Sequence, residues 1–137
     1  MREPDCIFCK ILAGELPATI VAEDERTIAF MDIAPATRGH ALVIPREHVP
    51  DLLSVRDEDL LAVALAARRL AARMSERLGA AGVNLINSCG AAAWQTVFHF
   101  HLHVIPRYED DPLRLPWTPT PGDPEQIAAA AQELAER

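Results

Sequence analysis

The sequence predicts one α+β domain, in which helices pack on one face of an antiparallel sheet. Its 137 residues are enough for a single domain with its own core. Short β-rich runs lie on both sides of one long helical pattern, which is the element order of an α+β fold. The run from Trp94 to Tyr108 alternates histidines with apolar residues, which is the period of a half-buried strand.

The first half of the chain contains a short helix and three strands. A helix is expected over residues 6–14, because Gly14 and then Pro17 prevent its continuation. Strands over 19–22 and 27–32, joined by a polar turn, have the pattern of an antiparallel hairpin. A third strand over 40–45 is nearly all apolar, so we expect it near the centre of the sheet.

The second half contains the long helix, two strands and a proline-rich tail. The helix is expected over 54–78, with Ser54 as a capping residue and Asp57 in its electropositive first turn. The fourth strand follows at 83–87, and the histidine run is the fifth. Prolines predict an extended segment over 109–124, and Pro124 opens a final helix that ends at residue 136. Residues 1–108 are expected to be the domain core, and residues 109–137 an extension of the same domain.

Composition and charge exclude several classes of function. The net charge of −7 and the pI of about 5.1 argue against nucleic acid as the main partner, because such binding needs clustered Lys and Arg. No stretch approaches the roughly 18 apolar residues of a membrane helix, and no secretion signal opens the chain. We therefore expect a cytoplasmic protein that does not bind membranes. Three cysteines in such a chain argue against a disulfide framework, and Cys6 and Cys9 alone could be a redox pair, half a zinc site or chance.

The histidine run carries the strongest chemical signal. His99, His101 and His103 would share one face of a strand. The other face would lie on the core and consists of Phe98, Phe100, Leu102 and Val104. Three such imidazoles suit a metal triad, or a division of nucleophilic, acid–base and orienting roles near neutral pH. If the third strand lies beside this one, His40 approaches the same face and His48 approaches its end.

The sequence resembles the histidine triad (HIT) family, and in particular bacterial members of its nucleoside-phosphoramidase and related branches. The signature is HFHLHVI at 99–105, and the matching pieces are CIFC at 6–9, FMDI at 30–33, GHALVIP at 39–45 and Asn87. The resemblance covers about residues 5–108. It implies the HIT fold, with a five-stranded antiparallel sheet, one long helix, a short N-terminal helix and a C-terminal helix.

The resemblance implies a nucleotide hydrolase or transferase that cleaves at the α-phosphorus of nucleoside 5′-phosphoramidates or related conjugates. At the matching positions His101 is the nucleophile that becomes nucleotidylated, and water then releases the nucleoside monophosphate, AMP in the simplest case. His103 and His40 would contact or orient the phosphate, and Gln95 would complete the catalytic group. This chemistry is sensible, because a neutral imidazole nitrogen is a good nucleophile and its phosphoramidate is labile.

Matching positions also imply the nucleotide-binding residues. Asp32 would bind the ribose hydroxyls, because a carboxylate suits two vicinal donors. The base would be surrounded by Ile7, Phe8 and Ile33, although ordinary core is nearly as good an interpretation of each of these residues. Asn87, Gln95 and Thr96 would lie at the phosphate or leaving group, beside His101 and His103. Trp94 stands where the family usually has glycine, which indicates a narrower leaving-group side or a different backbone angle.

The resemblance implies a structural zinc as well. In many bacterial members the positions of Cys6, Cys9, His48 and His99 hold four ligands, and all four positions here carry competent side chains. Such a site would tie the N-terminal helix to the sheet. It has no open position for water, so this zinc would not be the catalyst. No organic cofactor is expected.

Three other functions stay open at this point. The chain could be a dinucleoside polyphosphate hydrolase of the same family, or a module that binds a nucleotide with little turnover. It could also be a metallohydrolase in which His99, His101 and His103 hold a catalytic zinc. The expected partners are a purine nucleotide and a second copy of the chain, because the family and the exposed edge of a five-stranded sheet favour a homodimer. Trp117 is either a packing anchor or a contact to the partner's active site.

Overall fold

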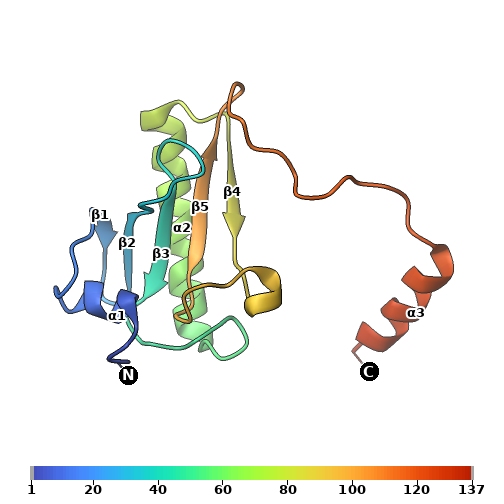
Figure 1. Cartoon of the computed structure of the whole chain (residues 1–137), viewed down its shortest axis with the longest axis horizontal. Coiled ribbons are helices and arrows are strands. Elements are labelled where there is room, and N and C mark those ends of the chain that lie inside the picture. Colours follow the sequence, from blue (N-terminus) through green and yellow to red (C-terminus); the bar gives the residue numbers. More distant parts are fainter. Residues whose placement is uncertain (1, 137) are drawn as a thin grey trace.

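The structure, a computed structural model, describes residues 2–136 and confirms the predicted five-stranded antiparallel sheet and its helices. In spatial order the strands are β1 (Ile20–Glu23), β2 (Thr27–Met31), β3 (Ala41–Pro45), β5 (Leu102–Arg107) and β4 (Gly82–Ile86). The helices are α1 (Ile7–Leu12), α2 (Asp57–Leu78) and α3 (Pro124–Leu134), and a 3-10 turn spans Ala91–Ala93. Figure 1 shows α2 running along the sheet, with β4 at one edge and β1 at the other.

The main core lies between α2 and the sheet. The helix contributes Val63, Ala67, Leu70 and Met74, which recur at helical spacing. The sheet side contributes Ala29, Ala41, Val43, Phe100 and Val104. At the far end of this core, the loop into β3 approaches α2 closely. Gly39 has a φ of +95°, which favours glycine, and a Cβ there would lie 2.5 Å from Leu78 Cδ1, so any other residue would strain the backbone and displace Leu78.

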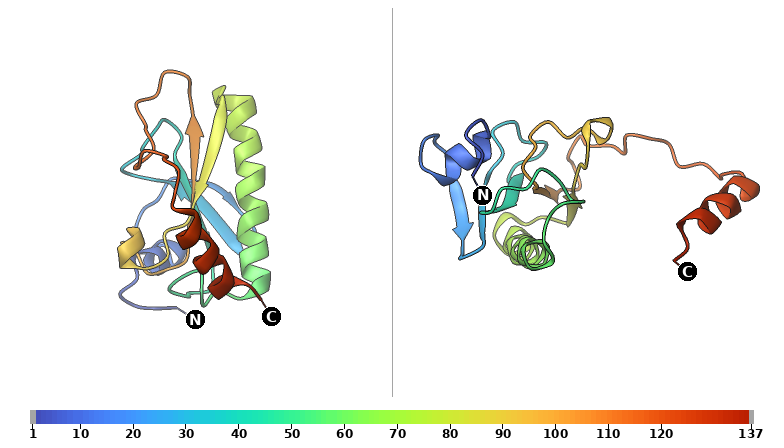
Figure 2. Two further views of the ribbon diagram at one scale, coloured as in Figure 1. Left: turned by 90° about the vertical axis from the view of Figure 1, so that its right-hand side faces the viewer. Right: turned by 90° about the horizontal axis from the view of Figure 1, so that it is seen from below.

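A second core lies on the opposite face of the sheet, under α1. Phe8 and Cys9 of this helix are buried against the side chains of β2 and β3 that point away from α2, namely Ile28, Phe30, Leu42 and Ile44. Figure 2 shows α1 and α2 on opposite sides of the sheet. The expectation that all helices pack on one face was therefore wrong. Successive residues of β2 and β3 point to opposite faces of the sheet, and both sets are apolar. Each face must therefore be packed against another element.

The long helix starts later than expected. It begins at Asp57, with Arg56 at the N-cap and no side-chain cap, so Ser54 as the cap was wrong. The Ser54 hydroxyl is instead 3.0 Å from the carboxylate of Asp51. The prediction for Asp57 is confirmed, because it lies in the first turn with two further acidic residues.

The histidine run is a strand only in its second half. β3 and β5 pair antiparallel, with Leu42 opposite His103, which confirms the expected neighbours. The strand begins at Leu102, so a single strand over the whole run was wrong. Before the strand, Phe100 N–H donates to Val49 O in the loop after β3 at 2.8 Å, and the Gln95 side chain donates to Pro50 O in the same loop. Phe98 is consequently 47% exposed and does not join the core.

The chain beyond β5 leaves the sheet. An extended segment leads to α3, which Asp123 caps through its bond to Glu125 N–H at 3.1 Å. Every described residue of α3 is exposed, and Figure 1 shows the helix standing away from the sheet, on the side of β4. Among the described residues, no helix is both long and apolar enough to cross a membrane.

Candidate functional site

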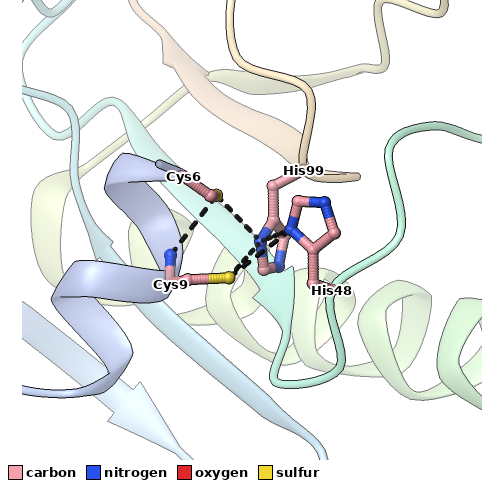
Figure 3. Close-up of side chains that lie close together, drawn as sticks. All are labelled: Cys6, Cys9, His48 and His99. Atoms are coloured by element: carbon pink, nitrogen blue, oxygen red, sulfur yellow. Dashed lines mark hydrogen bonds between the residues drawn. The ribbon is translucent and has the colours of Figure 1, made fainter. Parts of the chain in front are cut away.

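Two cysteines and two histidines converge between α1 and the sheet. Cys6 and Cys9 lie at the start of α1, His48 lies in the loop after β3, and His99 lies just before β5. Figure 3 shows their sulfur and ring nitrogen atoms pointing toward one another. All four donor atoms lie within 4.8 Å of each other.

The distances fit one tetrahedral zinc ion. The two Nδ1 atoms of His48 and His99 are 3.2 Å apart. Sulfur and nitrogen are separated by 3.4 Å between Cys6 and His99 and by 3.4 Å between Cys9 and His48. Zn–N bonds of about 2.0 Å and Zn–S bonds of about 2.3 Å at tetrahedral angles separate two nitrogens by about 3.3 Å and sulfur from nitrogen by about 3.5 Å.

The protonation of His99 also suits a ligand. Its Nε2 lies 2.8 Å from the Pro45 carbonyl, so Nε2–H donates and Nδ1 keeps a lone pair toward the cysteines. His99 is fully buried, and burial lowers its pKa to about 4, which keeps the ring neutral. Burial raises the pKa of the Cys6 thiol, so a bound cation is needed to stabilise the thiolate there. The donor set therefore fits zinc.

A cavity of about 410 Å³ opens beside this cluster, between α1 and the loop after β2. Most of its wall is apolar and comes from α1, β2 and β3. The polar and ionisable residues of the wall are Asp32, Thr96, His101 and His103. Ile7, Phe8 and Ile33 also line it, so seven of the residues expected to bind a nucleotide surround one cavity.

His101 is held as a neutral imidazole with a free lone pair. Its Nδ1 lies 2.7 Å from the His99 carbonyl oxygen, which can only accept, so Nδ1 carries the proton. Nε2 is then unprotonated. Burial lowers the pKa of His101, and the ring packs edge-on against Phe8 with centroids 5.2 Å apart. This is the state that a nucleophilic histidine requires.

A backbone group sets the protons on His40 and His103. Ala36 N–H donates to His40 Nδ1 at 3.0 Å, so the proton of neutral His40 lies on Nε2. That Nε2 is 2.9 Å from His103 Nδ1 and 3.4 Å from the Asp32 carboxylate. His40 therefore donates to His103, and His103 keeps its own proton on Nε2 as a donor. Burial lowers the pKa of His103 to about 4, so it too is neutral near pH 7.

The same protons disfavour a metal at this second cluster. Asp32, His40 and His103 offer three ligand atoms within 4.8 Å of one another. A metal on His40 Nε2 would need the proton on Nδ1, where it would face the N–H of Ala36. The N–H of Ala36, in the loop after β2, therefore favours a proton over a metal ion on His40 Nε2.

Asn87 and Gln95 do not line the cavity, and their side chains form hydrogen bonds with backbone groups. The Asn87 amide donates to the His101 carbonyl at 3.0 Å. Gln95 is buried; its Oε1 accepts from Gly90 N–H at 2.8 Å, and its Nε2 donates to Pro50 O at 2.7 Å. A second Nε2 bond reaches Val97 O at 3.1 Å, so both amide protons are engaged. The catalytic role expected of Gln95 stays a prediction.

The groups that sequence reasoning missed are all in the backbone. They are the N–H of Ala36 and the carbonyl of Pro45, which fix the protons on His40 and His99. No side-chain pattern identifies them. The nearest signal is the position of Pro45 at the end of a strand, directly before the loop that carries His48.

Comparisons with known proteins agree with this geometry. Residues 13–110 match the HIT domain family. The solved structure of a Streptococcus mutans protein superposes with a TM-score of 0.90 at 36% identity, covering 96% of this chain and 84% of the other. A zinc-bound histidine triad family protein from Mycobacterium smegmatis gives a TM-score of 0.78 at 41% identity, covering 94% and 95%. An adenosine 5′-monophosphoramidase of Schizosaccharomyces pombe is 36% identical over 96% of this chain and 97% of its own.

Proposed function

Because the chain belongs to the HIT family, we propose that it is a nucleotide hydrolase or transferase that acts on nucleoside 5′-phosphoramidates or related conjugates. One observation carries the proposal. The bond from His101 Nδ1 to the His99 carbonyl leaves an unprotonated Nε2 on a residue that lines a cavity of about 410 Å³. A cavity of this volume is within the range of small-molecule sites.

The first half of the reaction transfers the nucleotidyl group to His101. The Nε2 lone pair forms a bond to the α-phosphorus while the P–N bond of the substrate breaks. The electron pair of that bond stays on the amine nitrogen, which takes up one proton from solvent. The His99 carbonyl accepts a hydrogen bond from Nδ1–H, which stays on the ring, and so stabilises the positive charge that develops there.

The second half of the reaction regenerates the free imidazole of His101. Water attacks the phosphorus, the P–Nε2 bond breaks, and its electron pair goes back to His101 as the water proton passes to solvent. His103 supports both halves, because its Nε2–H can donate to a phosphoryl oxygen. His40 acts through His103 and orients it by the 2.9 Å bond. Gln95 and Asn87 position the segment that carries His101.

Asp32 is the proposed ribose ligand. One oxygen accepts from Ala34 N–H at 2.8 Å, and the carboxylate still has acceptor capacity at the cavity wall. A 2′-deoxyribose substrate should be cleaved with a kcat/KM about 10- to 100-fold lower, because bonds to charged groups contribute about 1.5–3 kcal/mol. Asp32→Asn should bring the two substrates close to equality. A variant that keeps the full preference for ribose would assign that preference to another residue.

The zinc ligands have a structural role in this proposal. Cys6 and Cys9 come from α1, whereas His48 and His99 come from segments that flank the sheet. A cation held by these four side chains would link α1 to the sheet and would hold Phe8 against His101. All four tetrahedral positions are filled by protein, so no position is left for a water or substrate ligand.

The geometry does not support the metallohydrolase alternative. His99 directs Nδ1 toward the cysteines, while His101 and His103 direct theirs to a backbone carbonyl and to His40. The three rings therefore do not converge on one point. Within residues 2–136, the groups that do converge are the two clusters described above.

The proposed activity is tested by AMP release. Wild-type protein is incubated with adenosine 5′-phosphoramidate and, separately, with a diadenosine polyphosphate. We expect AMP from the phosphoramidate. A faster reaction with the polyphosphate would place the protein among dinucleoside polyphosphate hydrolases. Tight AMP binding with no product from either substrate would make it a nucleotide-binding module and end the hydrolase proposal.

A homodimer is part of the proposal. β4 is an edge strand whose Leu85 and Ile86 are 49% and 44% exposed, and edge strands with unpaired backbone groups favour pairing. α3 exposes Ile127 and Leu134 on the same side of the molecule. Light scattering at micromolar concentration should give twice the 15.0 kDa chain mass. A mass near 15.0 kDa would end the idea.

A further inference from the structure

The hydrogen bond between His40 and His103 can hold its proton in two ways, and the two rings alone do not decide between them. If His40 Nε2 carries the proton, neutral His103 has its own proton on Nε2 and can donate to a phosphoryl oxygen. If His103 Nδ1 carries it instead, His103 Nε2 is a lone pair, which repels that oxygen. The Asp32 carboxylate lies 3.4 Å from His40 Nε2 and 3.9 Å from His103 Nδ1, so it can accept from either ring.

The choice depends on one backbone group, the N–H of Ala36. It donates to His40 Nδ1 at 3.0 Å, which leaves Nε2 to carry the proton of the neutral ring. Ala36 belongs to the loop of residues 33–39, between β2 and β3. Residues 33–35 are exposed, and Thr37 is the one buried residue of this loop, all of which the structure describes. The position of the Ala36 N–H therefore depends on hydrogen bonds more than on apolar packing.

Thr37 joins this loop to β5, the strand that carries His103 (Figure 1). Its hydroxyl donates to the Pro106 carbonyl at 2.6 Å, and the bond is buried. Pairing between β3 and β5 extends only to Ala41 and Val104, so residue 106 lies beyond the last pair on this side. Proline also has no N–H with which to extend a backbone ladder. The Thr37 hydroxyl supplies the link between loop and strand instead.

Tyr108 adds a second link between the loop and the end of β5. It follows the strand directly, and its hydroxyl donates to the Arg38 carbonyl at 2.7 Å. The His40 N–H donates to the Thr37 carbonyl at 3.2 Å and closes the turn that leads into β3. The loop is thus bonded to the β5 segment through residues 37 and 38, directly after Ala36. The group that sets the proton on His40 and the histidine that accepts this proton are therefore held by one strand.

We propose that Thr37 and Tyr108 are positioning residues that keep the Nε2 proton of His103 available to the phosphate. Their bonds hold the loop on β5, the loop holds the Ala36 N–H against His40, and that contact decides which ring carries the shared proton. The inference rests on the proposed function, because it concerns the donor that the phosphoryl group meets. Thr37 and Tyr108 do not line the cavity, so they act through the loop and touch no reacting atom.

The test measures the protonation of the ring nitrogens. Nitrogen-15 NMR of the full-length, zinc-loaded protein at pH 7, without substrate, distinguishes a protonated ring nitrogen from a lone pair. In the wild type, Nε2 of both His40 and His103 should be protonated. Thr37→Val has a similar shape but no hydroxyl. It should lower the ratio of this arrangement to the reversed one by about three- to tenfold, the effect of one hydrogen bond. kcat/KM for adenosine 5′-phosphoramidate should fall over the same range.

Three further variants separate positioning from stability. Thr37→Ser keeps the hydroxyl and should restore both the nitrogen signals and the activity. Thr27→Val is the matched control, because Thr27 is also a buried threonine but lies at the opposite end of β2 from Asp32. It should leave the signals and kcat/KM unchanged, whatever its melting temperature. Tyr108→Phe should move the signals in the same direction as Thr37→Val, and it replaces that variant in the test if the valine protein does not fold.

Two results would overturn the proposal. One is a wild-type spectrum with a lone pair on His103 Nε2. The other is a Thr37→Val protein that melts at a lower temperature but keeps the wild-type signals and activity, because the threonine would then be only structural. Absence of AMP release by the wild type would reject the proposed function alone, since the nitrogen signals are measured without substrate.

Discussion

His101→Ala should lower kcat/KM for AMP release from adenosine 5′-phosphoramidate by at least about 10⁴-fold, the scale of loss expected when a covalent nucleophile is removed. Alanine has no lone pair to attack phosphorus, and the remaining donors can only stabilise charge. The measurement is single-turnover and steady-state release of AMP by the wild type and the variant. A variant that keeps a tenth of the activity would mean that the nucleophile is a different group.

The control for this variant has to be nucleotide binding. The other four histidines of the chain all lie in one of the two clusters, so none offers a neutral histidine substitution. AMP should still bind to His101→Ala, because Phe8, Asp32 and the apolar wall of the cavity are unchanged. Loss of both binding and turnover would point to a damaged fold and not to a missing nucleophile.

Cys9→Ser should remove the zinc and lower the free energy of unfolding by at least about 3 kcal/mol, because structural zinc sites contribute about 10 kcal/mol or more to folding. Cys9 is 2% exposed and lies on α1 near the second core, so the loss would loosen that helix from the sheet. The measurements are the zinc content per chain and thermal unfolding. Full zinc content with an unchanged melting temperature would contradict the assignment.

Cys89→Ser is the matched control for the zinc site. Cys89 is the third cysteine of the chain, and it lies in the segment after β4, outside the ligand cluster. Its substitution should leave the zinc content unchanged and alter stability by less than about 1 kcal/mol. A chelator should lower the melting temperature of the wild type, whereas the kcat of protein that is still folded should not change. Loss of kcat without unfolding would make the metal catalytic.

The hydrophobic periodicity of the sequence predicted most of the helices and strands. The exact start of β5 and the position of α1 depend on tertiary packing, which periodicity does not show. The apolar run of β3 and the alternation of the histidine run correctly indicated neighbouring strands, because both patterns belong to a sheet. The start of β5 was misplaced, since β3 pairs with it only as far as Leu102 and the preceding residues bond to the loop after β3. No periodicity shows which face of a sheet a short helix covers, so the place of α1 could not be predicted from sequence alone.

The residues of the site were predicted from the sequence, whereas the positions of the protons on His40 and His99 were not. The cluster of Cys6, Cys9, His48 and His99 follows from the family resemblance, and the approach of His40 to the face of His103 follows from the pairing of the third and fifth strands. Which nitrogen of each ring is protonated depends on backbone groups of the folded chain, such as the N–H of Ala36. The sequence indicated that Trp94 is unusual, but only the structure shows that it adopts a positive φ.

The most direct test of the account is to trap the nucleotidylated protein. Wild-type protein is mixed rapidly with adenosine 5′-phosphoramidate and quenched in base, because a phosphorus–imidazole bond hydrolyses in acid. Peptide mass spectrometry with fragmentation then locates the adduct. The account predicts AMP on His101, with no adduct in His101→Ala. AMP on His99 or His103, or turnover with no adduct on any residue, would contradict it.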